Sequence, residues 1–335
     1  MDQDWGRRYE YVLLDESTIT SLLQPVFPGR TLTSARLLTA GKCNTNYKVN
    51  VSGLNETYVL RVHVRDPRGG EKDLNLFQLI QGRVPVPHIL YTTTGSDPGA
   101  ISYTIMSWVE GILFSDVLAS KNEAAIADCA YDIGLNLANI GTYTFPRTGF
   151  FGPDLTIVEV IEEGGMLSYF EQFLFHGNTG QNLGATLTQL LWSFLKNNAR
   201  YFDVLDGARS LVHSDFKGFN ILVRQNKERW NVTAVLDWEF AFAGSPLVDI
   251  GNMLRYSHLH PPIFESEFIR GYREQGGILT PEWKKVAKLL DLLSLCEFLN
   301  APAPRDALRQ EVTGLITRTL THWDEYGEQT ARSQC

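Results

Sequence analysis

Cysteine is scarce in this chain of 335 residues, and its spacing excludes two kinds of site. The four cysteines are Cys43, Cys129, Cys296 and Cys335, and no two of them form a C-x-x-C pair. Such isolated cysteines fit neither a zinc site nor a disulfide framework. Because unpaired cysteines are typical of a reducing compartment, we expect a cytoplasmic protein.

Long apolar runs and an excess of basic charge are also missing. No stretch reaches the about 18 uninterrupted apolar residues of a membrane span, and the first residues lack the apolar core of a secretion signal. The 38 Asp and Glu residues outnumber the 30 Lys and Arg residues, which leaves a net charge of −8. Nucleic acids and anionic membranes bind basic surfaces, so we expect neither as a partner.

The order of the predicted elements indicates an α+β protein of two lobes. Short β-branched and aromatic runs predict strands over residues 35–40, 46–52, 57–64, 88–91 and 103–109, with one helix over residues 71–80. This β-β-β-α-β-β order favours a mostly antiparallel sheet. Amphipathic helices are predicted over residues 124–143, 166–175, 185–202, 264–273, 281–298 and 306–323, with a β-rich interruption over 210–240. We therefore place the lobes at residues 1–108 and 109–335.

Two neighbouring segments carry residues that suit phosphoryl transfer. Residues 211–223 contain the pattern H-x-D-x-x-x-x-N, with Asp215 and Asn220 on one short loop, and Asp237 ends the apolar run that follows. Transfer of a phosphoryl group to an alcohol needs a carboxylate beside the hydroxyl and oxygen ligands for Mg²⁺. Each residue alone could be structural, Asp215 in an Asx-turn and Asp237 at a helix N-cap or turn. Their combination favours a kinase site.

This combination resembles the aminoglycoside phosphotransferase (APH) and choline kinase-like branch of the protein-kinase fold. The resemblance covers residues 37–255 and implies a bilobal fold, ATP as phosphate donor and Mg²⁺ as cofactor. It makes Asp215 the catalytic base and assigns the metal to Asn220 and Asp237. His213 would have a packing and hydrogen-bonding role, and Asp249 would anchor the catalytic loop.

The same resemblance assigns the nucleotide phosphates to the first lobe. Residues 39–48, with Gly41 and Lys42, resemble the turn that covers these phosphates, although an ordinary hairpin turn is the alternative. Arg61 stands where protein kinases have lysine, and Glu71 would be its ion-pair partner. A guanidinium offers a fork of donors that matches phosphate. How the phosphate contacts are divided among Lys42, Lys48 and Arg61 stays open.

Residues 106–111 resemble the hinge between the lobes. The adenine would bond to the main chain of Ser107 and Val109, while Trp108 could either contact adenine or belong to the core. On this view residues 1–108 bind the nucleotide, and residues 109–335 carry catalysis and the acceptor.

Three functions compete at this point. A small-molecule kinase is favoured over a protein kinase, because only residues 238–248 separate Asp237 from Asp249 and leave no room for a long activation loop. A pseudokinase binding module is opposed by the intact Asp215, Asn220 and Asp237.

The acceptor is predicted least directly. We expect a hydroxylated small molecule that is cationic, such as an aminoglycoside or another amino sugar or amino alcohol, because the net charge is −8. The acidic residues that could surround it are Glu162, Glu163, Glu239, Asp291 and Glu297. A neutral metabolite such as homoserine or a sugar is the alternative.

Overall fold

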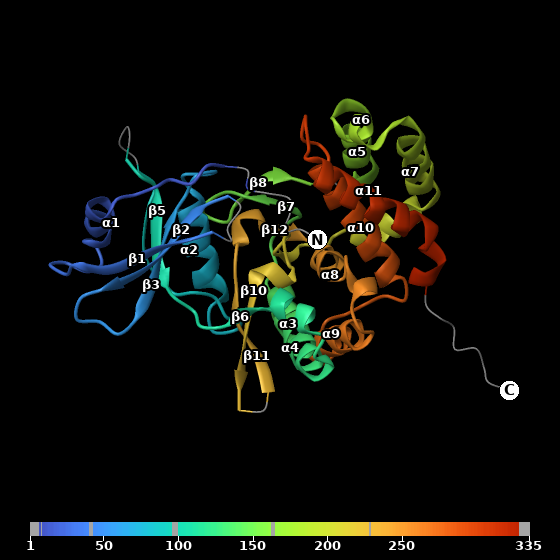
Figure 1. The fold of residues 1–335 in the computed structure, drawn as a ribbon. Helices are drawn as coiled ribbons and strands as arrows, with labels where there is room; N and C mark the ends of the chain where they lie inside the picture. Colours follow the sequence, from blue (N-terminus) through green and yellow to red (C-terminus); the bar gives the residue numbers. More distant parts are fainter. Residues whose placement is uncertain are drawn as a thin grey trace.

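The first lobe is built on a five-stranded antiparallel sheet, coloured blue to cyan in Figure 1. The computed structural model describes residues 7, 9–39, 43–95, 100–161, 165–227 and 229–327. The strands are β1 (Leu32–Leu38), β2 (Thr45–Val51), β3 (Thr57–Val62), β4 (Ile89–Thr93) and β5 (Tyr103–Ser107), in the spatial order β1-β2-β3-β5-β4. Helix α2 (Gly69–Ile80) lies between β3 and β4 in the chain, so the predicted β-β-β-α-β-β order is confirmed.

The two faces of this sheet bury different kinds of side chain. Tyr47, Val49 and Leu60 form a core with Ile19 and Leu23 of helix α1 (Glu16–Leu23), which covers the outer face. The sequence analysis missed α1, whose eight residues hold few periodic positions and whose start is fixed by the Asp15 side chain on the Thr18 N–H at 2.7 Å. Side chains alternate along a strand, so the residues between these apolar positions lie on the other face, where Arg61 meets Asp73 of α2 and Asp237 of the second lobe.

The second lobe is mainly helical. Its helices are α3 (Phe114–Ser120), α4 (Glu123–Gly141), α5 (Met166–Glu171), α6 (Thr179–Leu183), α7 (Ala185–Asn197), α8 (Leu247–Met253), α9 (Ile263–Glu274), α10 (Trp283–Phe298) and α11 (Asp306–Thr321). The six predicted helices are all present, while the short α3, α6 and α8 were not predicted. One apolar core joins α4 and α9 to α2 of the first lobe, and a second joins α5, α7, α10 and α11.

Short strands bracket the two segments that the sequence analysis singled out. Three of them, β6 (Ile112–Leu113), β10 (Ile221–Asn226) and β11 (Arg229–Val235), form one small sheet, and β7 (Gly149–Phe151), β8 (Ile157–Val160), β9 (Ser210–Val212) and β12 (Phe242–Gly244) form another. Residues 213–220 connect β9 to β10, and residues 236–241 connect β11 to β12. Both connections are thereby held at strand ends between the lobes.

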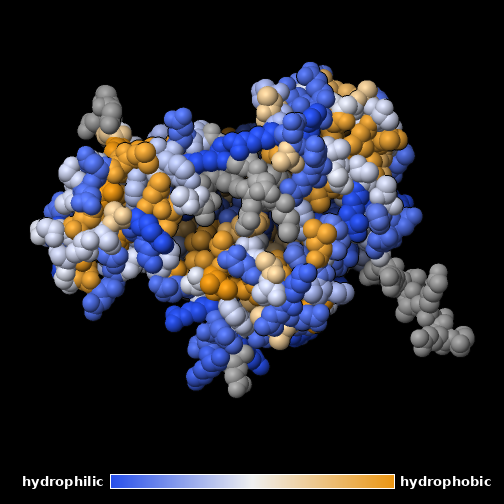
Figure 2. Space-filling model, viewed as in Figure 1, coloured by the Kyte–Doolittle hydropathy of each residue, from blue (hydrophilic) through white to orange (hydrophobic). Residues whose placement is uncertain are grey.

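The face of the molecule drawn in Figure 2 carries both polar and apolar residues. Figure 2 shows hydrophilic residues over most of the visible face, with apolar residues gathered in separate patches. Among the described residues, no helix is long and apolar enough to cross a membrane.

A buried ion pair links the segment just after α8 to α10. Arg255 donates from Nε and Nη2 to Asp291 Oδ1 at 2.8 and 2.7 Å, and both side chains are 3% exposed. Removing one partner leaves an unpaired charge in the core, which costs about 3–5 kcal/mol. Arg255→Ala should therefore lower the free energy of unfolding by about this amount in urea titrations.

The matched control is Arg309→Ala on α11. Arg309 pairs with Asp306 at 2.7 Å, but both side chains are exposed, so its loss should change stability little. Equal effects of the two substitutions would contradict the structural role of the Arg255–Asp291 pair.

Candidate active site

The loop of residues 213–220 is held from below by Asp249 of α8. The two carboxylate oxygens of Asp249 accept the main-chain N–H groups of His213 and Ser214, each at 2.8 Å. Ser214 adopts a left-handed conformation with φ 70°, and its carbonyl accepts the side-chain amide of Asn252 at 2.9 Å. Asp249 is fully buried, and this burial raises its pKa to about 7. The expected anchoring role of Asp249 is confirmed.

His213 is a buried structural residue of this loop. Its Nδ1 accepts the Asp215 N–H at 3.2 Å, so the ring proton is on Nε2 and is donated to the Leu236 carbonyl at 2.8 Å. The ring is 0% exposed, and burial lowers its pKa. His213 is therefore neutral and hydrogen-bonded on both sides, as the packing role required.

Asp215 is the carboxylate at the centre of the loop. The Asn220 side-chain amide donates to the main-chain oxygen of Asp215 at 2.9 Å and to Asp215 Oδ2 at 2.7 Å. Lys217 Nζ lies 2.7 Å from Asp215 Oδ1. These contacts hold the carboxylate in one orientation and place a positive charge beside it. The sequence analysis did not single out Lys217, although its position two residues after Asp215 was a usable signal.

Asp237 connects this loop to the first lobe. Its backbone is left-handed with φ 60°, and the preceding Leu236 N–H donates to the Asn220 carbonyl at 2.8 Å. The Asp237 side chain caps no helix. Instead, its Oδ1 lies 2.8 Å from Arg61 Nη2, and 42% of the side chain is exposed. Asp237 thus stands at a turn before the 3₁₀ segment Trp238–Phe240, as the alternative expected, but its side chain pairs with Arg61 and does not act as a cap.

Arg61 lies on β3 and has a different acidic partner from the one predicted. Its Nη1 lies 3.4 Å from Asp73 Oδ2, and its Nε donates to Asn46 Oδ1 at 3.1 Å. The predicted partner Glu71 pairs instead with Arg68 at 2.9 Å. Two residues along a helix differ by about 200° in direction, so Glu71 and Asp73 face opposite sides of α2. The predicted Arg61–Glu71 pair is wrong.

Charged side chains of both signs gather around Arg61: three carboxylates and, with Arg65 and Lys72, three cations. Asp73 is 3% exposed, its pKa is raised to about 6 by burial, and its Oδ1 has no hydrogen-bond partner among the described residues. Burial and then the charge of Asp237 raise the pKa of Glu239, whose Oε2 lies 3.6 Å from Arg65 Nη1. The cluster is therefore close to electrically balanced, and Asp73 Oδ1 is its carboxylate oxygen without a partner among the described residues.

The donor atoms here fit Mg²⁺. The Asn220 amide hydrogens both go to Asp215, so its Oδ1 oxygen accepts nothing from the described residues. Asp237 likewise has Oδ2 outside its ion pair with Arg61. Mg²⁺ binds through one or two carboxylates together with phosphate oxygens and water, so two protein oxygens on adjoining loops suffice.

The main chain of the predicted hinge is hydrogen-bonded at two positions and has no hydrogen-bond partner among the described residues at a third. The Ser107 N–H donates to His88 O at 2.9 Å and the Trp108 N–H to Thr57 O at 3.0 Å. Within the described part of the chain, the main chain of Val109 has no hydrogen-bond partner. Trp108 is not a core residue, because its ring lies under Lys48 Nζ at 3.8 Å.

The basic residues that were predicted to bind the nucleotide phosphates lie at two separate places. Arg61 lies beside Asp237, whereas Lys48 lies at the hinge on Trp108. Gly41 and Lys42 lie outside the described residues. Cys43, which follows them in the chain, has a side-chain hydrogen bond with Glu239.

Comparison with known proteins decides the family. The sequence model of the phosphotransferase enzyme family (APH) matches residues 34–289, most of the chain. The chain belongs to the APH family. No curated protein sequence matches it. The match of the family model confirms the predicted family and, with it, the predicted small-molecule kinase activity.

Solved structures of similar fold are aminoglycoside phosphotransferases. A ternary complex of APH(4)-Ia with AMP-PNP and hygromycin B has a TM-score of 0.68 at 20% identity, covering 94% of this chain and 100% of that one. The GDP complex of an aminoglycoside 2′-phosphotransferase-IIIa mutant has a TM-score of 0.66 at 17% identity, over 93% and 97% of the two chains. A gentamicin complex of APH(2″)-IIa has a TM-score of 0.62 at 17% identity, over 92% and 97%. The bilobal protein-kinase-like fold is thereby confirmed.

The corrected ion pair can be tested directly. Asp73→Asn removes the charge that holds Arg61 on the α2 side and should raise KM for ATP by about tenfold, since a buried charge-assisted contact is lost. Glu71→Gln is the control on the same helix and should leave KM unchanged, because Glu71 pairs with Arg68. Steady-state kinetics with varied ATP distinguishes them, and a larger effect of Glu71→Gln would restore the original assignment.

Proposed function

We propose that this APH enzyme transfers the γ-phosphate of ATP to a hydroxyl group of a cationic small molecule, an amino sugar or amino alcohol. The observation that carries the proposal is the contact across the lobes. Arg61 on β3 meets Asp237 at 2.8 Å, and Asn220 joins Asp237's segment to Asp215. A nucleotide phosphate bound between Arg61 and Asp237 would lie beside the carboxylate of Asp215.

Asp215 is proposed as the catalytic base. Its carboxylate is oriented by Asn220 and by Lys217, so it can accept the hydroxyl proton without rearranging. In a loose phosphoryl-transfer transition state, orientation of the hydroxyl contributes at least as much as basicity. Lys217 lies close enough to balance negative charge that develops near Asp215.

Asn220 and Asp237 are the proposed Mg²⁺ ligands, and the bound metal would neutralise charge on the transferred phosphate. Arg61 is proposed to bind the phosphates when the nucleotide is present, since its guanidinium already lies beside Asp237. Gly41, Lys42 and Glu71 were also expected at the nucleotide. Glu71 is no longer proposed, and the other two stay predictions.

The proposed division of labour follows the two lobes. Residues 1–108 would bind the nucleotide, with the base at Ser107 and Val109. The Ser107 N–H is already bonded in the sheet, which leaves its carbonyl for the base. Residues 109–335 would carry the base, the metal ligands and the acceptor.

Fewer observations support the positive charge of the acceptor than support the phosphoryl transfer itself. The net charge of −8 favours a cation, and the similar structures named above include complexes with hygromycin B and gentamicin. Two of the expected acceptor carboxylates already have partners, which argues against a cationic acceptor: Asp291 pairs with Arg255, and Glu239 pairs with Arg65. Glu162 and Glu163 lie outside the described residues. The loss of two expected carboxylates favours a neutral sugar or amino-acid alcohol as the second candidate.

Asp215→Asn tests the catalytic base. Asparagine keeps the shape of the side chain but accepts no proton, so kcat should fall by about 10²–10⁴-fold while ATP affinity changes little. Asp206→Asn, at an exposed position outside the site, is the control. Turnover near the wild-type level with a cognate acceptor would reject the assignment.

Asp237→Asn tests the metal site. Asparagine tolerates the left-handed backbone, so the change removes charge without straining the turn. Nucleotide affinity should fall clearly in the presence of Mg²⁺ and should not fall in EDTA, because the carboxylate repels a metal-free triphosphate. The measurement is calorimetric titration of the nucleotide. Equal affinities with and without Mg²⁺ in the wild type would contradict a metal-dependent site.

A panel of hydroxylated compounds tests the acceptor. ADP release should be fastest with an amine-bearing compound, and its KM should rise between low and physiological salt, because exposed charge pairs are screened over about 8 Å. Cationic compounds are compared with homoserine and neutral sugars of similar size. If the best acceptor is neutral, the cationic proposal fails while the kinase activity stands.

A further inference from the structure

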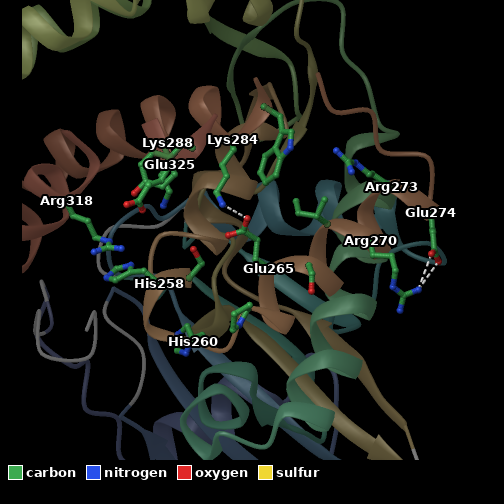
Figure 3. Close-up of a pocket in the computed structure, with 16 residues that line it drawn as sticks. His258, His260, Glu265, Arg270, Arg273, Glu274, Lys284, Lys288, Arg318 and Glu325 are labelled. Atoms are coloured by element: carbon green, nitrogen blue, oxygen red, sulfur yellow. Dashed lines mark hydrogen bonds and ion pairs between the residues drawn. The ribbon is translucent and has the colours of Figure 1, made fainter. Parts of the chain in front are cut away.

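The second lobe contains a cavity that shares no residue with the proposed active site. Its volume is about 880 Å³, and it is lined by α9, α10, α11 and the short 3₁₀ segments Ser257–Leu259 and Trp323–Tyr326. Arg61, Asp215 and Asp237 are not among the lining residues. Figure 3 shows the lining side chains of this cavity.

The lining carries the opposite charge to the chain as a whole. Five Lys and Arg side chains line the cavity against three Glu side chains, in a protein of net charge −8. Two of these acids are already paired, Glu265 with Lys284 at 2.5 Å and Glu274 with Arg270 at 3.1 Å. Glu325 is the only remaining acid of the lining for Arg273, Lys288 and Arg318.

Arg318 lies at one end of the cavity, and Arg273 lies at the other. Its Nε is buried and has no hydrogen-bond partner among the described residues, and no described carboxylate pairs with its guanidinium. Figure 3 shows Arg318 beside His258, with Lys288 and Glu325 next to them. A buried guanidinium donor without a partner costs free energy, and an anion would supply the missing acceptor.

His258 and Lys288 complete this end. Lys288 is 6% exposed, and its Nζ donates to the Leu254 carbonyl at 3.0 Å. Loss of hydration, followed by the positive charges of Arg318, Lys288, His260 and His322, lowers the pKa of His258 to about 4. The imidazole is therefore neutral near pH 7, because burial and then the neighbouring cations disfavour its protonated form.

We propose that the Arg318, His258 and Lys288 end of this cavity binds the phosphate group of a small phosphorylated molecule. The three side chains come from three different elements, so they approach a ligand from several directions. The oxygens of a phosphate dianion point to the corners of a tetrahedron and can accept from donors on several sides. The two oxygens of a carboxylate lie in one plane and cannot. Trp283 and Tyr326 line the same cavity and offer aromatic surface to an organic group. Free phosphate and an organic phosphate share this chemistry.

The test uses inorganic phosphate and glucose 6-phosphate as probes, each titrated calorimetrically into the full chain in a phosphate-free buffer. We expect saturable binding that Arg318→Gln weakens by about tenfold or more, since a charge-assisted contact is lost. Arg318→Lys keeps the charge without the fork and should give an intermediate loss. Tighter binding of glucose 6-phosphate would indicate an organic phosphate, and equal binding would indicate free phosphate.

Two controls make the result decisive. Arg309→Gln, on the same helix but paired with Asp306 outside the cavity, should leave binding unchanged. Asp237→Asn alters the proposed active site and should also leave it unchanged. Binding that responds to Asp237→Asn but not to the Arg318 variants, or the absence of saturable binding, would overturn the proposal. Thermal melting of each variant establishes whether it is folded. If Arg318→Gln does not fold, the proposal is tested with Arg318→Lys alone.

Discussion

The ion pair between Arg61 and Asp237 is the contact on which the arrangement of the site depends. It joins β3 of the first lobe to the segment after β11, across 176 positions of sequence. Arg61 is 9% exposed and also meets Asp73, so its charge is compensated from both lobes. Leaving a buried cation without these partners would cost about 3–5 kcal/mol of folding free energy. The pair therefore holds α2, β3 and the Asp237 turn in one geometry.

The loop of residues 213–220 is held by a second set of constraints of a different kind. Ser214 and Asp237 both adopt left-handed backbones, which are costly for residues other than glycine. Asp249 offsets this cost at Ser214 by accepting two main-chain N–H groups, and the Leu236 N–H ties the Asp237 turn to Asn220. The strain therefore lies where Asp215, Asn220 and Asp237 need fixed directions, and the supporting groups lie beneath them.

The cationic cavity in the second lobe shows why net charge is a weak guide to a local site. The chain carries −8 overall, yet Arg318 has no acidic partner among the described residues. In the opposite sense, Asp291 was a plausible ligand for a cationic acceptor and is instead neutralised by Arg255. Helix α10 contributes both Asp291 and Lys288, and only the packing of α8 and α11 against it decides what each one meets.

The sequence by itself determined the order of the first-lobe strands and of the long helices, and it indicated the family. It also singled out Asp215, Asn220, Asp237 and Asp249, which the structure brings close together. These follow from local patterns, because hydrophobic periodicity and a short motif are written in consecutive residues. The short helices α1, α3, α6 and α8 escaped, since few turns carry little periodicity. Only the tertiary structure decided that Asp73 and not Glu71 meets Arg61, that Lys48 covers Trp108, and that Asp291 is internal. The direction of a helix face, and contacts between distant segments, depend on how elements pack and not on any one of them.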